Sequence, residues 1–103
     1  MRIAGVTGLN SATLNGVYKR VGEAYNDKPL FQKEGDCNVW LRYTKIFSWS
    51  FCCTEDKDAN NTTSWCCSAV KGLAHPLEAQ AWRVWSGSEW EDQLAVTATL
   101  EVR

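Results

Sequence analysis

Two apolar runs near the middle of the chain are separated by a polar segment. Residues 47–53 and 64–67 are rich in Phe, Trp and Cys, whereas residues 54–63 are polar and turn-forming apart from one alanine. Two apolar runs around such a segment are typical of antiparallel strands joined by an exposed loop. We therefore predict a central hairpin around which the rest of the chain is organised.

Four cysteines lie where the two strands of this hairpin meet the loop. In a symmetric hairpin, Cys53 lies opposite Cys66 and Cys52 lies opposite Cys67. Successive side chains of a strand point to opposite faces of the sheet, so each face receives one pair of thiols.

The apolar segment just before the hairpin extends the predicted sheet. A two-residue turn at 44–45 sets Trp40 opposite Trp49 and Cys37 opposite Cys52. The aromatic-rich face is expected to be the core face, because Trp and Phe bury the most area per residue. Its members are Trp40, Phe47, Trp49, Phe51, Cys53, Cys66 and Val70. The opposite face then carries a row of thiols at Cys37, Cys52 and Cys67.

Shorter alternating segments flank this centre. They predict strands near residues 3–6, 17–21, 30–33, 82–85 and 94–102, the last with Val96, Ala98, Leu100 and Val102 inward. Only residues 76–81 have helix-friendly composition, enough for at most one short helical turn that begins at Pro76. The sum is an all-β fold, a small antiparallel sandwich or barrel of about seven to nine short strands. We expect the first and last strands to pair.

Length and charge narrow the function classes. A chain of 103 residues makes one domain, which we take to span residues 1–103. A net charge of -1 provides no basic surface, so we expect no nucleic-acid partner. No apolar run approaches the roughly 20 residues of a membrane-spanning helix, so we expect no membrane span.

The five cysteines leave three alternatives. They are buried reduced thiols, one or two cross-strand disulfides, or a metal site. Adjacent cysteines clamp a metal ion poorly, because neighbours on a strand point in opposite directions. In the symmetric register only one of two adjacent opposed pairs has the closer spacing, so at most one disulfide is expected within the hairpin.

A family resemblance covers nearly the whole chain. It is carried by Val6-Thr7-Gly8, Asn10, Asn15-Gly16-Val17-Tyr18, Trp40-Leu41-Arg42-Tyr43, Trp49, Thr54-Glu55-Asp56-Lys57-Asp58, Trp82-Arg83-Val84, Gly87 and Trp90. Together these segments resemble a tryptophan-rich β-module that occurs, sometimes in tandem, in large multi-domain proteins of algae and other protists. The resemblance implies an accessory or interaction role and no particular site residues.

The polar segment contains a calcium-like spacing. Asp56, Asp58 and Asn60 match the first three oxygen ligands of a calcium loop. The glycine expected next is Asn61, and the closing acid falls on Cys67, which favours a solvated hairpin loop instead. Two overlapping glycosylation triplets begin at Asn60 and Asn61 and matter only in a secretory lumen.

The sequence contains few side chains arranged for catalysis. A cysteine nucleophile needs a base, and His75 is the one histidine of the chain, in a loop before Pro76. No glycine-rich phosphate loop follows any predicted strand, and no cofactor is expected. A thiol-dependent redox protein or enzyme is therefore the third of our hypotheses.

Six tryptophans are the strongest compositional anomaly. Most of them can fill the core of a small β domain. Trp85 and Trp90 flank a glycine turn, and Trp85 points away from the face shared by Trp82 and Val84, so at least one tryptophan of this group is expected near the surface. The first hypothesis is thus a non-catalytic interaction or accessory module, such as a small subunit or repeat of a larger assembly, that docks a protein partner through exposed Trp side chains and strand edges. The second is a carbohydrate-binding module whose candidate residues are Trp85, Trp90 and Trp40.

Overall fold

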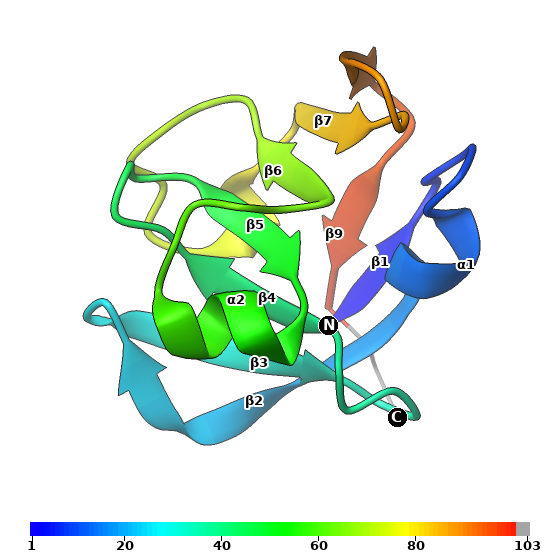
Figure 1. Cartoon of the computed structure of the whole chain (residues 1–103). Helices are drawn as coiled ribbons and strands as arrows, with labels where there is room; N and C mark the ends of the chain where they lie inside the picture. The colour runs from blue at the N-terminus through cyan, green and yellow to red at the C-terminus, as the bar shows by residue number, and fades with distance from the viewer. Residues whose placement is uncertain (101–103) are drawn as a thin grey trace.

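The computed structural model describes residues 1–100, whose strands form one curled antiparallel sheet (Figure 1). The nine strands are β1 (Arg2–Ala4), β2 (Gly16–Tyr25), β3 (Lys28–Lys33), β4 (Trp40–Tyr43), β5 (Trp49–Cys52), β6 (Cys66–Ser68), β7 (Trp82–Trp85), β8 (Trp90–Gln93) and β9 (Thr97–Thr99). Their order in the sheet is β8-β7-β6-β5-β4-β3-β2-β1-β9. The all-β class is confirmed, and so is the pairing of the first strand with the last.

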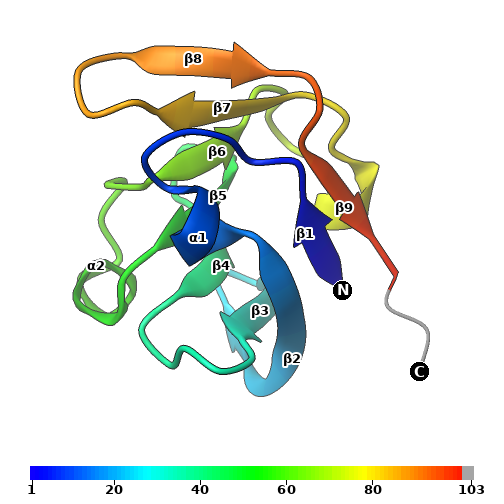
Figure 2. The ribbon, with the colours of Figure 1, turned by 90° about the vertical axis from the view of Figure 1, so that its right-hand side faces the viewer.

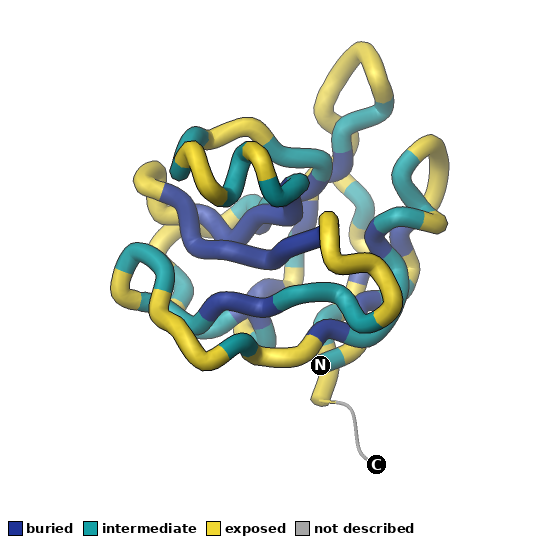
Figure 3. The backbone as a smooth tube through the Cα atoms, turned by 60° about the horizontal axis from the view of Figure 1, so that its bottom comes forward, coloured by how far each residue is buried: buried dark blue, intermediate teal, exposed yellow. Residues whose placement is uncertain are grey.

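The core fills the concave side of the curled sheet. Every residue of β4 and β5 is buried, and Figure 3 shows these buried segments in the interior with exposed loops around them. The inward side chains are Ile3, Tyr18, Phe31, Leu41, Tyr43, Trp49, Phe51, Cys66, Trp82 and Val84. On the convex side, Leu30, Trp40 and Cys52 form a second, smaller cluster. Both faces of the central strands are therefore covered.

The two ends of the sheet come together beside β1. The side chain of Gln93 forms two hydrogen bonds with the backbone of Thr7. It accepts one from the amide at 3.0 Å and donates one to the carbonyl at 3.1 Å. Nδ2 of Asn10 donates to the carbonyl of Trp85 at 2.9 Å. Figure 2 shows the loop after β1 beneath the β7 and β8 hairpin. Side-chain bonds thus link the loop after β1 to the β7 and β8 hairpin at the far end of the sheet.

Three short helical segments interrupt the strands. They are α1 (Ser11–Leu14), α2 (Thr54–Ala59) and the 3-10 turn η1 (Pro76–Glu78), of which η1 lies where one helical turn was predicted. The polar segment expected to be a loop contains α2. Glu55 and Asp56 in its first turn suit the positive end of a helix, and Asn60 ends it with a φ of 51°. None of the helices within residues 1–100 is long and apolar enough to cross a membrane.

The register predicted for the central hairpin is wrong by two residues. Cys66 lies opposite Phe51 and Cys67 lies opposite Ser50, so neither Cys52–Cys67 nor Cys53–Cys66 is a directly opposed pair. The cause is the asymmetric connection, because Cys53 leaves the strand to precede α2. A shift of two residues keeps every side chain on its predicted face, so Cys66 still points into the core.

The register predicted between β4 and β5 is wrong by three residues. Trp40 lies opposite Cys52, so it is Trp40 and not Cys37 that faces this thiol. The turn has three residues, 45–47, closed by a 2.8 Å bond from the amide of Thr44 to the carbonyl of Ser48. An odd shift exchanges the faces, so Trp40 is on the convex side while Leu41 and Tyr43 enter the core.

Three further residues expected inward are not. Phe47 and Val70 are exposed at the rim, and Cys53 is only half-buried before α2. In the last strand, Val96 is buried and Ala98 packs against the core as predicted, whereas Leu100 is exposed because β9 ends at Thr99. Val102 lies outside the described residues.

Candidate functional site

Trp85 and Trp90 form an aromatic pair at the end of the β7 and β8 hairpin. They lie directly opposite each other, with ring centroids 5.4 Å apart and ring planes inclined by 63°. Trp90 is 43% exposed and Trp85 is half-buried. The structure therefore brings these two predicted site residues together at the surface.

A third indole completes a groove. The amide of Trp85 donates to the carbonyl of Trp65 at 2.8 Å, which places Trp65 beside the pair. An open hollow of ≈ 440 Å³ is lined by Trp65, Trp85, Trp90 and residues 62–64, and we call it the tryptophan groove. The sequence analysis did not include Trp65 among the candidate site residues. The available signal was its position next to Cys66 at the start of a predicted strand. Trp65 also packs against the main core, which fixes its ring.

The polar groups of the groove are hydrogen-bond donors and hydroxyls. Elsewhere in the fold the indole N–H groups of Trp40 and Trp49 bond to Thr54 and to the carbonyl of Leu73. Within residues 1–100 the N–H groups of the three groove indoles donate no hydrogen bond to another protein group. Thr62, Thr63 and Ser64 add hydroxyls, while no carboxylate, amide, imidazole or thiol side chain lines the groove.

Residues 62–64 of the groove lining form what we call the groove wall, which is held by Arg42, whose side chain is fully buried on the convex face of β4. Its Nη2 donates to the carbonyl of Thr63 at 2.7 Å and to Oδ1 of Asn61 at 3.3 Å. Its Nη1 donates to the carbonyl of Asp56 at 2.8 Å and to the hydroxyl of Tyr25 at 3.2 Å. A single guanidinium thus joins the sheet, α2 and the groove wall.

The three calcium candidates do not converge on one point. The Asp56 carboxylate accepts bonds from Cys53 at 3.3 Å and from Asn61 at 2.8 Å. Asp58 pairs with the neighbouring Lys57, and Asn60 exchanges two 3.0 Å bonds with Asn26. The described part of the chain holds no group of three or more His, Cys, Asp or Glu side chains placed to bind a metal ion. Oxygen atoms of Asp56, Asn61 and Thr63 in this loop instead accept hydrogen bonds from the guanidinium of Arg42.

The third tryptophan candidate lies outside the groove. Trp40 is only 9% exposed, and its indole donates to Oγ1 of Thr54 at 2.8 Å. The Lys57 ammonium sits 4.2 Å from its ring centroid, a cation–π contact that covers the ring. Trp40 therefore packs α2 onto the sheet and is not available for stacking.

The five thiols are free and dispersed. Burial raises the pKa of Cys52 to about 12 and also raises the pKa of Cys66 and Cys67 above the ordinary value. Cys53 donates to the Asp56 carboxylate, and Cys37 is exposed in the loop between β3 and β4. A raised pKa keeps a thiol protonated and poorly nucleophilic at neutral pH, which argues against Cys52, Cys66 and Cys67 as nucleophiles.

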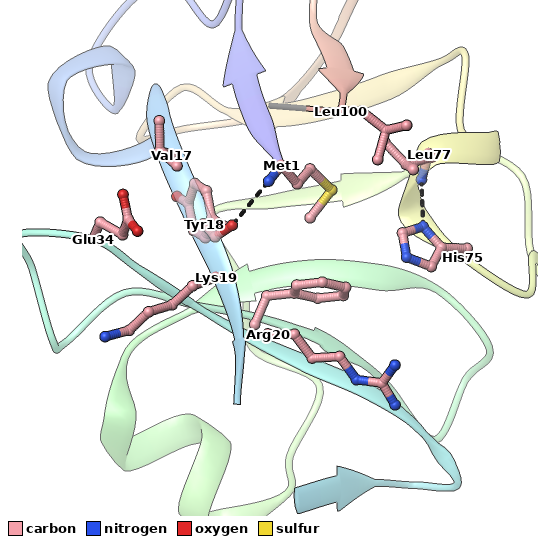
Figure 4. Close-up of a pocket in the computed structure, with 10 residues that line it drawn as sticks. Met1, Val17, Tyr18, Lys19, Arg20, Glu34, His75, Leu77 and Leu100 are labelled. Atoms are coloured by element: carbon pink, nitrogen blue, oxygen red, sulfur yellow. Dashed lines mark hydrogen bonds between the residues drawn. The ribbon is translucent and has the colours of Figure 1, made fainter. Parts of the chain in front are cut away.

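A second hollow of ≈ 360 Å³ is lined on one side by His75 (Figure 4). The imidazole packs against Phe31 with ring centroids 5.5 Å apart, and its Nδ1 accepts from the amide of Leu77 at 3.1 Å. The amide of His75 donates to the Glu78 carboxylate at 2.9 Å, which completes a capping box for η1. Burial lowers the pKa of His75. These contacts account for the histidine as a structural residue.

Comparison of the chain with protein-family models, with curated proteins and with solved structures finds no match. The resemblance to a tryptophan-rich β-module of algae and protists therefore stays a prediction.

Proposed function

We propose that this chain is a non-catalytic binding module that holds its ligand in the tryptophan groove. The observation that carries the proposal is the gathering of Trp65, Trp85 and Trp90 around one open hollow. Indoles left in contact with water at a concave site are typical of interaction surfaces, because covering them releases a large apolar area.

The fold holds the residues that line the groove in place. Trp85 and Trp90 lie on paired strands, Trp65 packs against the core, and Arg42 fixes the carbonyl of Thr63. A site that is already ordered loses little conformational entropy when a ligand binds, so more of the contact energy appears as affinity. The lining side chains provide apolar faces and hydrogen bonds but no general acid, general base or thiol nucleophile, which supports binding as the task.

The test is a parallel screen of a random peptide library and a glycan array. The wild type is compared with a Trp85→Ala, Trp90→Ala double variant, and Leu94→Ala serves as the matched control because Leu94 is 81% exposed and is not part of the groove lining. We expect ligands that bind the wild type and the control but not the double variant. The proposal is wrong if neither library contains a ligand that distinguishes the double variant from the control. Selection from the glycan array alone would make the module a carbohydrate-binding one.

A further inference from the structure

We infer that the ligand of the tryptophan groove is a proline-rich peptide in the polyproline II conformation with a basic residue beside it. This inference rests on the proposed function and names the class of ligand for that site. Three independent properties of the groove favour it: the angle between its rings, the kind of polar groups it presents, and the charge around it.

The rings make a notch and not a flat platform. The planes of Trp85 and Trp90 are inclined by 63°, with centroids 5.4 Å apart. One flat sugar ring, or a straight run of them, cannot stack on both faces at once. The two rings touch edge to face, so nothing enters between them, but a compact proline ring, which protrudes from a three-fold polyproline II helix as a ridge, can pack into the angle that they form.

The indole N–H donors match a ligand backbone that is rich in hydrogen-bond acceptors and poor in donors. The three groove indoles offer N–H donors that no group within residues 1–100 uses, and the groove has no carboxylate or amide side chain. Proline has no backbone N–H, and the polyproline II backbone leaves its carbonyl groups unpaired. Each hydroxyl of a sugar also brings a donor, and the lining side chains offer only the hydroxyl oxygens of Thr62, Thr63 and Ser64 as acceptors, so a glycan with many hydroxyls would leave donors unmatched here.

The surroundings of Trp90 are acidic. Glu89 precedes it in the turn and is exposed, Glu91 is exposed on the other face of β8, and Asp92 is paired with Arg83 at 3.1 Å, so the β7 and β8 hairpin carries a net negative charge. Charge of one sign next to a binding site speeds the encounter with ligands of the opposite sign and selects against ligands of the same sign. An Arg or Lys next to the proline segment is therefore favoured, and an acidic peptide is disfavoured.

The experiment uses a fluorescent peptide of three Pro-Pro-Ala repeats with Arg at each end. A control peptide has the same termini and charge but Ala in place of each Pro. Binding is measured by fluorescence anisotropy and by the change in indole emission. We expect the proline peptide to bind the wild type at least about ten-fold more tightly than the control peptide, since a rigid ligand loses less entropy on binding.

The protein variants separate ring contact from hydrogen bonding. Trp90→Ala is expected to weaken binding at least about ten-fold, and Trp90→Phe by a smaller factor because it keeps a ring but loses the N–H donor. Leu94→Ala is expected to bind as the wild type does. A Glu89→Gln, Glu91→Gln double variant is expected to weaken binding of the Arg-flanked peptide and to reduce its salt dependence. Circular dichroism of each variant checks that the fold is retained.

The outcomes distinguish this inference from the proposed function. Equal binding of the proline and alanine peptides, or full binding to Trp90→Ala, overturns the polyproline assignment. If the library screen returns glycans or proline-free peptides that the Trp85→Ala, Trp90→Ala variant loses, the binding module stands and only its ligand class is wrong. If no ligand depends on the groove, both proposals fail.

Discussion

Nη2 of Arg42 donates a 2.7 Å hydrogen bond to the backbone carbonyl of Thr63, so a buried guanidinium holds one wall of the tryptophan groove. The other terminal nitrogen of the same side chain donates to the carbonyl of Asp56 in α2 at 2.8 Å. Arginine suits this place because its planar fork presents several donors in fixed directions. The strand β4, the helix α2 and the groove wall are thereby connected through one residue.

Replacement of Arg42 by Leu is expected to lower the free energy of unfolding by about 2 kcal/mol, because it leaves the partly buried carbonyl oxygens of Asp56 and Thr63 without their charged donor. Arg42→Lys keeps a charge but reaches fewer acceptors, so its loss should be smaller. Urea unfolding of the two variants and the wild type gives the comparison. A loss below about 0.5 kcal/mol for Arg42→Leu would mean that water satisfies these carbonyls instead.

The backbone of Ala95 passes close to Gly5, which leads to a second prediction. A Cβ at Gly5 would clash with the backbone carbonyl oxygen of Ala95, and φ is +86°. Gly8 has a similar φ of +87° but open space around it, and Gly22 has neither constraint. We expect Gly5→Ala to cost more than about 3 kcal/mol or to prevent folding, Gly8→Ala to cost about 1 kcal/mol, and Gly22→Ala to be neutral or slightly stabilising. Equal losses for Gly5→Ala and Gly8→Ala, read from thermal unfolding, would show that strain in φ alone matters.

The alternation of apolar residues was enough to predict the class of fold and much of the core, but not the registers. Phe51 and Cys66 were placed inward correctly because an error of two residues preserves the faces. Trp40 was placed inward wrongly because its turn has one residue more than predicted. That turn needs Phe47 at a φ of 68°, a conformation that Gly or Asn usually signals, so the local sequence did not reveal it.

The candidate site was predictable only where it is local. Trp85 and Trp90 belong to one hairpin with a glycine turn, so their pairing follows from the chain between them. Trp65 comes from a separate strand, and its position depends on the register of β6 with β7. Arg42 is harder still, because an arginine within a strand is normally an exposed residue and only the tertiary fold gives it buried acceptors.

The environment of His75 predicts a pH dependence of stability. Burial lowers the pKa of the folded state below the ordinary value of about 6.5, although the nearby Glu78 carboxylate opposes the shift. Just below pH 6.5 the unfolded chain therefore binds a proton that the folded chain does not, so the free energy of unfolding falls as the pH falls through this window. His75→Asn keeps an acceptor for the amide of Leu77 but does not titrate, and its stability should change less over the same window. Parallel curves for the two proteins in chemical unfolding would rule out His75 as the source.

We expect one of the five cysteine thiols to react rapidly with an alkylating reagent and the other four to react slowly. Cys37 is exposed, whereas Cys52 and Cys66 are buried with a raised pKa, so only Cys37 should react rapidly with iodoacetamide at neutral pH. Cys67 is half-buried and has a raised pKa, and Cys53 is held against a carboxylate, so both should react slowly.

Mass spectrometry of the native protein after a short and a long exposure resolves the fast site, and Cys37→Ser should remove it. Alkylation after denaturation without a reductant should then label all five cysteines, because the observed register leaves neither Cys52 opposite Cys67 nor Cys53 opposite Cys66. Rapid labelling of Cys52 or Cys66, or a pair of sites protected until a reductant is added, would show that the central strands pack differently.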